Sequence, residues 1–275
     1  MRLFRKIRKA LILISSRPRG FKDYCASIAC AFLKTKDNIG LPVHITIEPA
    51  NTCNLHCPVC ETGSGTLNRP KGMMQLNDFK FIIDKIYQHV NSIFFYFMGE
   101  PFLNSESYNM IRYAKDKGLY IHSCTNGHFL DAEKLINSGI DEISVQIGGI
   151  KQETHQIYRK GSYLENILTN VEQVDKKKSE RCAVNPKIIL GLILMKHNES
   201  EIEDFLKLAQ KLKVDEARVI SPCVRTLKQG KEFLPINEKY WIYDKTAFEK
   251  VVLRPQKMLS NRCNWIYLST VILCN

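Results

Sequence analysis

Residues 44–60 read HITIEPANTCNLHCPVC, a short run of strand-forming residues followed by a loop that carries three cysteines. The run 44–48 is β-branched and alternates apolar with polar side chains, which is typical of a strand. Cys53, Cys57 and Cys60 then follow at a C-x3-C-x2-C spacing. The rest of the chain repeats the strand-then-helix order that this stretch begins.

Strand patterns alternate with helical patterns six times between residues 44 and 222. The predicted strands cover 44–48, 93–98, 119–124, 142–147, 187–194 and 217–221. The predicted helices cover about 77–90, 106–117 and 131–138, and two more start near 163 and 200. Short connections between such units imply parallel strands joined by right-handed crossovers. We therefore expect an α/β fold, a partial (β/α)6 TIM-like barrel with fewer units than the eight of a closed barrel.

Capping residues predict where the helices begin and end. Asn77 and Ser162 are the expected N-caps of the first and fourth helices, because short polar side chains accept hydrogen bonds from the first helical N–H groups. Ser200 and Glu203 form the capping-box pattern. The polar, Lys-rich residues 172–186 predict a helix end and a surface loop.

Length and charge divide the chain into three parts. Its 275 residues are at the upper end of what one domain occupies. We expect a basic N-terminal arm at 1–43, a core at 44–222 and a short C-terminal extension at 223–275. In residues 1–40, ten basic side chains against two acidic ones contribute +8 of the net charge of +12. Charge gathered in an arm, and not over a domain face, disfavours a nucleic-acid partner.

The first 16 residues are basic and partly apolar. The apolar run 10–16 is too short for a signal peptide, and no stretch reaches the roughly 18 apolar residues of a membrane span. Leu3, Phe4 and Ile7 fall on one side of a helix with basic residues on the other. We expect a cytoplasmic protein. A solvated tail and contact of residues 1–16 with the inner membrane surface both stay open.

The ten cysteines include one close cluster, the loop at residues 53–60. Without an export signal, the thiols are expected to stay reduced. Three thiolates so close in sequence converge on a metal or cluster, or form a disulfide that leaves one thiol over. Three protein ligands on a four-iron cluster leave one iron open to a further ligand. The alternative is a structural zinc site that recruits a fourth ligand such as His56.

A C-x3-C-x2-C loop directly after the first strand of a βα series resembles the radical S-adenosylmethionine (SAM) superfamily, over about residues 44–222. The resemblance implies that Cys53, Cys57 and Cys60 hold a [4Fe–4S] cluster. It also implies an enzyme in which one electron from the cluster cleaves SAM to methionine and a 5′-deoxyadenosyl radical, which abstracts hydrogen from a substrate. A flavodoxin-like or ferredoxin-like protein would donate the electron.

The same resemblance gives roles to polar residues that follow the predicted strands, where such barrels place their active sites. Gly99 and Glu100 resemble the end of a Gly-Gly-Glu motif that holds the amino group of SAM. Asn126 and Ser144 resemble polar residues that face its ribose or methionyl end. Arg159 resembles the arginine that pairs with the SAM carboxylate, which suits its fork of donors.

Three positions depart from the family pattern. Met98 replaces the first glycine of Gly-Gly-Glu, and Val59 stands where many members have an aromatic residue. Gln146 stands where many members have an aspartate, so one charge is missing at that contact.

The C-terminal residues resemble the opening of a SPASM or twitch extension, in which later cysteines hold auxiliary clusters. Cys263 and Cys274 are the candidate residues there. We expect this extension to be incomplete in the chain as given.

Three hypotheses follow for the function. The leading one is a radical SAM enzyme of the SPASM-like branch with an unknown substrate, for which a peptide or protein is one candidate class. The second is an iron–sulfur or zinc protein that uses the cysteine loop for structure or electron transfer. The third is an RNA-modifying enzyme on the same scaffold, suggested by the basic arm.

Overall fold

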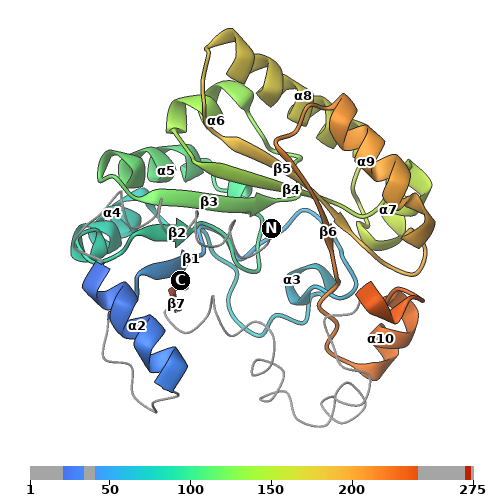
Figure 1. Cartoon of the computed structure of the whole chain (residues 1–275), viewed down its shortest axis with the longest axis horizontal. Helices are drawn as coiled ribbons and strands as arrows, with labels where there is room; N and C mark the ends of the chain where they lie inside the picture. Colours follow the sequence, from blue (N-terminus) through green and yellow to red (C-terminus); the bar gives the residue numbers. More distant parts are fainter. Residues whose placement is uncertain (1–20, 34–40, 241–269, 274–275) are drawn as a thin grey trace.

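The computed structural model describes residues 21–33, 41–240 and 270–273. Within these residues, seven strands form one parallel sheet in the order β6-β5-β4-β3-β2-β1-β7 (Figure 1). The strands are β1 (His44–Ile47), β2 (Ser92–Phe94), β3 (Tyr120–Thr125), β4 (Glu142–Ile147), β5 (Lys187–Ile193), β6 (Glu216–Ile220) and β7 (Thr270–Leu273). The predicted series of six βα strands is confirmed as β1 to β6, and β7 adds a further parallel strand beside β1.

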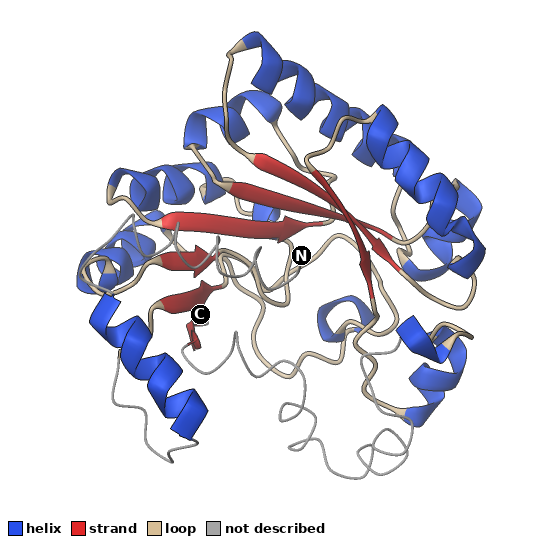
Figure 2. Ribbon diagram, viewed as in Figure 1, coloured by secondary structure: helices blue, strands red, loops and turns tan. Residues whose placement is uncertain are grey.

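Helices follow the strands in the order that the sequence predicts. They are α2 (Phe21–Leu33), α3 (Glu61–Ser64), α4 (Leu76–Ile86), α5 (Ser107–Asp116), α6 (Ala132–Ser138), α7 (Gln152–Tyr158), α8 (Leu164–Glu180), α9 (Ile202–Lys211) and α10 (Leu227–Phe233). Short 3-10 turns lie at η2 (Pro101–Leu103), η3 (Glu199–Glu201) and η4 (Glu238–Tyr240). Figures 1 and 2 show α4, α5, α6, α8 and α9 along one side of an open sheet, and α3 and α10 on the other side.

The main core lies between the sheet and the outer helices. In α4, Phe79 and Ile83 are one helical turn apart and both are completely buried, which explains why this amphipathic segment docks on the sheet. Phe79 meets Phe95 edge to face with ring centroids 5.8 Å apart. Truncating such a buried phenylalanine to alanine costs about 3–5 kcal/mol. This core therefore holds the sheet in place, and the polar residues lie on the opposite, inner face of the same sheet.

Side chains alternate between the two faces of β3. Ile121, Ser123 and Thr125 are fully buried, whereas His122 and Cys124 are half-buried on the opposite, inner face. The same inner face continues into β4, because Cys124 pairs in register with Ser144. Polar residues thus line a face that closed barrels fill mostly with branched apolar side chains.

Two predicted N-caps are wrong. The helix α4 begins after Gln75, and Asn77 lies inside its first turn. The helix α8 begins after Tyr163, and neither Gln75 nor Tyr163 forms a side-chain capping bond. Ser162 makes long-range hydrogen bonds in place of a cap.

The predicted capping box and the predicted loop also differ from the structure. Ser200 lies in the turn η3 and Glu203 inside α9, which starts after Glu201 without a side-chain cap. Most of the segment 172–186 is helical, because α8 continues to Glu180. In α8, Val174 is buried like Val171 one turn earlier. The apolar face of the helix therefore continues into the segment whose polar composition predicted a loop. The helix α7, between β4 and α8, was not expected.

Some predictions concern residues outside the described part of the chain, namely the interfacial helix at 1–16 and the cysteines Cys263 and Cys274. The division into 1–43, 44–222 and 223–275 stays a prediction. Among the residues that the structure describes, no helix is both long and apolar enough to cross a membrane.

Candidate functional site

The three cysteines of the loop after β1 belong to, or pack against, one hydrophobic cluster of side chains at the carboxyl end of the sheet. Cys57 is buried inside this cluster, and Cys53 and Cys60 pack against it. The cluster also contains Tyr158 of α7 and Phe233 of α10, whose rings meet at 5.9 Å. Elements that follow β4 and β6 therefore pack on the loop that follows β1.

Backbone hydrogen bonds hold the cysteine loop to its neighbours. The His56 N–H donates to the carbonyl of Lys160 at 2.9 Å, which joins the loop to the segment after α7. The Glu100 N–H donates to the carbonyl of Thr52 at 2.8 Å, which joins it to the segment after β2. The loop is thus fixed by contacts that do not involve the thiols.

Gly99 lies directly against the start of the cysteine loop. A Cβ atom at this position would lie 2.0 Å from the carbonyl oxygen of Ala50 and 2.8 Å from the Cα of Asn51. Both are backbone atoms that no rotamer change can move away. A glycine at this position allows the two backbone segments to approach each other, whereas the role of Gly99 in holding SAM, implied by the family resemblance, stays a prediction.

Glu100 is buried and its carboxylate accepts three hydrogen bonds. Oε1 accepts from the Thr125 hydroxyl at 2.6 Å and the Phe102 N–H at 3.2 Å, and Oε2 accepts from the Asn126 N–H at 2.8 Å. Burial raises the pKa of Glu100, and these donors oppose that rise. Glu100 therefore joins the carboxyl ends of β2 and β3 beside the cysteine loop.

Asn126 brings β3 into contact with the loop. Its Nδ2 donates to Asn54 Oδ1 at 2.7 Å and lies 3.8 Å from Cys53 Sγ, within the range of a weak bond to sulfur. Its Oδ1 accepts from the His128 N–H at 3.0 Å. Asn126 is thus oriented by a turn of its own loop and points its amide group at the cysteines.

Arg159 approaches the loop from the end of α7. Its Nη1 lies 3.9 Å from Cys57 Sγ, and its Nε is buried with no hydrogen-bond partner among the described residues. Burial raises the pKa of the Cys57 thiol, and the Arg159 charge counteracts this rise. Burial also raises the pKa of Cys53 to about 11. Protons must therefore leave these thiols before they bind a metal.

Ser144 lies one layer further along the inner face, on β4 beside Cys124. Its hydroxyl accepts from Gln146 Nε2 at 2.7 Å. Gln146 Oε1 is buried without a hydrogen-bond partner in the described part of the chain and lies over Gly191, where a Cβ atom would be 2.3 Å away. Hydrogen bonds thus connect Asn126 with Glu100 and Cys53, and they place Ser144 in a separate pair.

One further ion pair at this site, Glu48 with Arg69, was not singled out from the sequence. The buried carboxylate of Glu48, at the end of β1, accepts from the Met98 N–H at 2.8 Å and pairs with Arg69 at 2.5 Å. It holds the backbone next to Gly99. A carboxylate at the end of the predicted strand 44–48, shortly before the cysteine loop, is the sequence signal that could have indicated Glu48.

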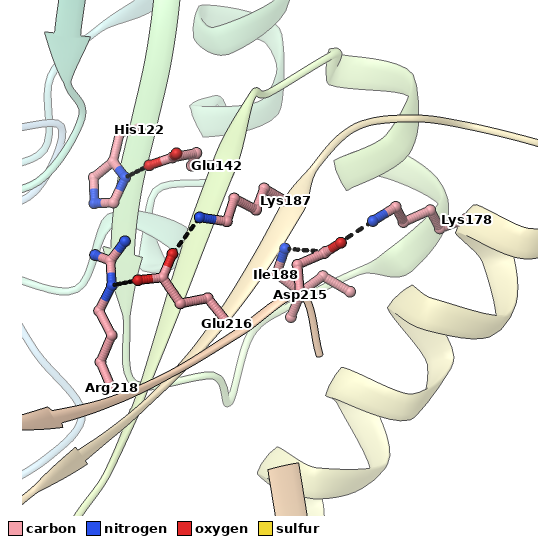
Figure 3. Close-up of polar contacts among 8 residues, drawn as sticks. All are labelled: His122, Glu142, Lys178, Lys187, Ile188, Asp215, Glu216 and Arg218. Carbon is pink, nitrogen blue, oxygen red and sulfur yellow. Dashed lines mark hydrogen bonds and ion pairs between the residues drawn. The ribbon is translucent and has the colours of Figure 1, made fainter. Parts of the chain in front are cut away.

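A polar network also covers the inner face away from the cysteine loop (Figure 3). Glu216 lies between Lys187 and Arg218, with Arg218 Nε 2.8 Å from Glu216 Oε1. On the neighbouring strands, His122 Nδ1 lies 3.0 Å from Glu142 Oε2. Polar residues at every second position of β4, Glu142, Ser144 and Gln146, are the sequence signal for this wall.

The side chains around the loop are of the types that the implied cofactors need. Three thiols are soft ligands of the kind that iron–sulfur clusters use. The buried Nε of Arg159 and Oε1 of Gln146 lack partners in the described residues, and such polar atoms are available to a ligand. Within the same described residues, no group of three or more His, Cys, Asp or Glu side chains is placed to hold a metal ion. In their chemistry, the residues fit an iron–sulfur cluster and a polar cofactor.

An open parallel α/β barrel with a three-cysteine loop at the carboxyl end of its first strand defines a class of iron–sulfur enzymes. The chain belongs to the radical SAM superfamily, whose sequence profile matches residues 47–209. Members of this family use a [4Fe–4S] cluster and SAM, so the predicted family, enzyme class and cofactors are confirmed.

Three known proteins illustrate the similarity. AdoMet-dependent heme synthase of Methanosarcina barkeri is 31% identical over 176 residues, which cover 62% of this chain and 48% of that protein. SuiB of Streptococcus suis, solved with S-adenosylmethionine, has a TM-score of 0.57 at 15% identity and covers 86% of this chain and 51% of its own. The enzyme anSMEcpe with bound AdoMet has a TM-score of 0.59 at 18% identity and covers 77% and 59%. The chain thus spans about half the length of its curated relative.

Proposed function

We propose that this chain is a radical SAM enzyme in which Cys53, Cys57 and Cys60 hold the [4Fe–4S] cluster. The observation that carries the proposal is that Cys53, Cys57 and Cys60 share one hydrophobic cluster of side chains at the carboxyl end of the sheet, with Arg159 Nη1 3.9 Å from Cys57 Sγ. When bound, the cluster and SAM supply one electron and an adenosyl radical that removes hydrogen from a substrate. The protein binds and orients the reacting groups and excludes water.

The residues around the loop are proposed to bind SAM. Gly99 exposes backbone groups beside the loop, and Glu100 offers a carboxylate oxygen to the amino group. Arg159 offers two parallel donors to the carboxylate. Asn126 and Ser144 would face the ribose or methionyl end. The contacts of Glu100 and Asn126 with each other and with the loop support a shared role.

A peptide or protein is the proposed substrate class. SuiB has been solved bound to the precursor peptide SuiA, and it shares this fold. A flavodoxin-like or ferredoxin-like protein is the proposed electron donor.

The cellular setting is also a proposal. We infer a cytoplasmic protein whose residues 1–16 contact anionic lipid at the inner membrane surface, supported by the +8 charge of residues 1–40. Cosedimentation of the full chain and of a chain lacking residues 1–16 with anionic vesicles tests this. Loss of vesicle binding is expected on deletion, and equal binding by both chains would contradict it.

Anaerobic reconstitution with iron and sulfide tests the main proposal. The expected result is a four-iron cluster by Mössbauer spectroscopy and formation of 5′-deoxyadenosine after addition of dithionite and SAM. Cys57→Ala should lose most of the cluster iron and all of this product. Cys182→Ala, which removes an exposed cysteine, is the matched control and should retain both.

Two results would contradict the proposal. One is a protein that binds a single zinc ion and no iron–sulfur cluster. The other is a four-iron cluster that forms equally well in Cys57→Ala, because the loop would then not supply the ligands. A complete cluster that yields no 5′-deoxyadenosine would favour the electron-transfer hypothesis.

A further inference from the structure

Three side chains joined by hydrogen bonds lie next to the residues proposed to bind SAM. The hydroxyl of Ser162 lies 2.7 Å from His155 Nε2 and 2.9 Å from His128 Nε2. His155 and Ser162 are buried, and His128 is half-buried. The group was not part of the sequence-based site, in which Ser162 was only a helix cap.

The hydrogen-bond partners fix where each hydrogen lies. The Gly148 N–H donates to His155 Nδ1 at 3.1 Å, so His155 carries its hydrogen on Nε2 and donates it to Ser162. The Ser162 hydroxyl is then free to donate to His128 Nε2. Burial lowers the pKa of His155 to about 3 and also lowers the pKa of His128, which keeps both rings neutral. Each hydrogen bond in this series therefore donates in the same direction, from Gly148 through His155 and Ser162 to His128.

The two ends of this chain reach the loops after β4 and β3. On the β3 side, the backbone N–H of His128 donates to Asn126 Oδ1 at 3.0 Å, so the residue whose ring accepts from Ser162 also orients the amide that contacts the cysteine loop. On the α7 side, Arg159 lies between the other two members. The backbone N–H of Arg159 donates to the His155 carbonyl at 3.0 Å, and the backbone carbonyl of Arg159 accepts from the Ser162 backbone N–H at 3.0 Å.

Two glycines allow α7 to pack on the end of β4. A Cβ atom at Gly149 would lie 2.4 Å from Thr154 Oγ1 and 2.7 Å from the His155 backbone nitrogen. A Cβ atom at Gly148 would lie 3.1 Å from Arg159 Cγ. The first turn of α7 and the Arg159 stem therefore rest directly on the backbone, and the position of Arg159 depends on how α7 is held.

We infer that His155, Ser162 and His128 are positioning residues that hold Arg159 and Asn126 in place for SAM. The inference rests on the proposed function and adds residues that lie behind the direct contacts. A side-chain placement error of about 1 Å can cost a large factor in rate or binding, so such a second layer has a measurable effect.

Ser162→Ala in the reconstituted enzyme tests the inference. It removes the hydroxyl that connects the two rings and leaves every proposed SAM contact in place. We expect the Kd for SAM, measured by equilibrium binding of labelled SAM, to rise about tenfold. The iron content and the rate of 5′-deoxyadenosine formation at saturating SAM should stay within about twofold of the wild-type values. Ser162→Thr keeps the hydroxyl and should restore most of the affinity.

A pair of variants at His128 gives a second measurement, because this half-exposed ring tolerates change better than the buried Ser162. His128→Gln retains an acceptor near the Nε2 position and should bind SAM almost normally. His128→Leu removes it and should weaken binding about as much as Ser162→Ala. The matched control is Ser138→Ala, since Ser138 is also buried but donates only within α6, to Leu135 at 2.7 Å.

The outcomes separate this inference from the proposed function. If Ser162→Ala and His128→Leu bind SAM with the wild-type Kd, the positioning role is wrong, although the enzyme class stands. An equal loss of affinity in Ser138→Ala would also overturn it, because the effect would then be general destabilisation. If the wild-type protein assembles no cluster or binds no SAM, the proposed function itself fails.

Discussion

Arg159 Nη1 lies 3.9 Å from Cys57 Sγ, although 102 residues separate the two in the chain. Cys57 belongs to the loop after β1, and Arg159 follows α7, which is the crossover after β4. The two meet because the loops of parallel strands gather at one edge of the sheet. A fixed positive charge therefore lies beside the thiols, where an anionic cofactor group would be stabilised.

Replacing Arg159 should separate cofactor binding from cluster assembly. Arg159→Gln removes the charge and the fork of donors, so we expect SAM to bind at least about tenfold more weakly, the loss of about 1.4 kcal/mol. Cluster iron should stay near the wild-type amount. Equilibrium binding of labelled SAM and iron analysis measure both. Arg112→Gln, at an exposed arginine paired with Asp116, is the control, and a wild-type SAM affinity in Arg159→Gln would contradict the assignment.

Gly99→Ala should disturb the start of the cysteine loop. Its Cβ atom would lie 2.0 Å from the Ala50 carbonyl oxygen, so one backbone segment must move. We expect a loss of about 1–3 kcal/mol in the free energy of unfolding, measured by urea denaturation, and reduced cluster iron. Gly72→Ala is the matched control, because nothing lies within 4 Å of a Cβ at that position. Equal stability of the two variants would show that the close contact is not maintained.

The stability contributed by Glu100 should fall as the pH rises. Burial raises its pKa above the ordinary value of 4.5, so the folded state binds the proton more tightly than the unfolded chain. Relative to Glu100→Gln, which does not titrate, the wild-type Tm should therefore decrease from about pH 4.5 upward and level off once the raised pKa is passed. Thermal unfolding across this range measures the difference, and a difference that grows with pH would refute the prediction.

Glu216 should show the opposite trend. The hydrogen bond from Arg218, aided by Lys187, lowers its pKa to about 2 despite some burial. The stabilising contribution is therefore complete above the ordinary pKa of 4.5 and is lost as the pH falls toward 2. The Tm of the wild type minus that of Glu216→Gln should increase from pH 2 to about pH 5. A flat difference over this interval would mean that the ion pair of the inner wall is not formed in solution.

Much of the fold could be predicted because its signals are local. The run 142–147 is predicted and observed as a strand with identical bounds, and Phe79 and Ile83 fall on the apolar face that was expected. The helix boundaries were less accurate. Asn77, Ser162 and Ser200 are good capping residues by type, but the observed N-caps lie one or two residues away, and α7 depends on contacts with the end of β4.

The sequence by itself determined the series of strands and helices and the spacing of Cys53, Cys57 and Cys60, since both follow from residues close together in the chain. Only the tertiary structure decided that Arg159 meets Cys57, that Ser162 connects two histidines, and that Glu216 pairs with Lys187 and Arg218. The physical reason is that these partners come from different βα units, and the order and register of the strands bring them together.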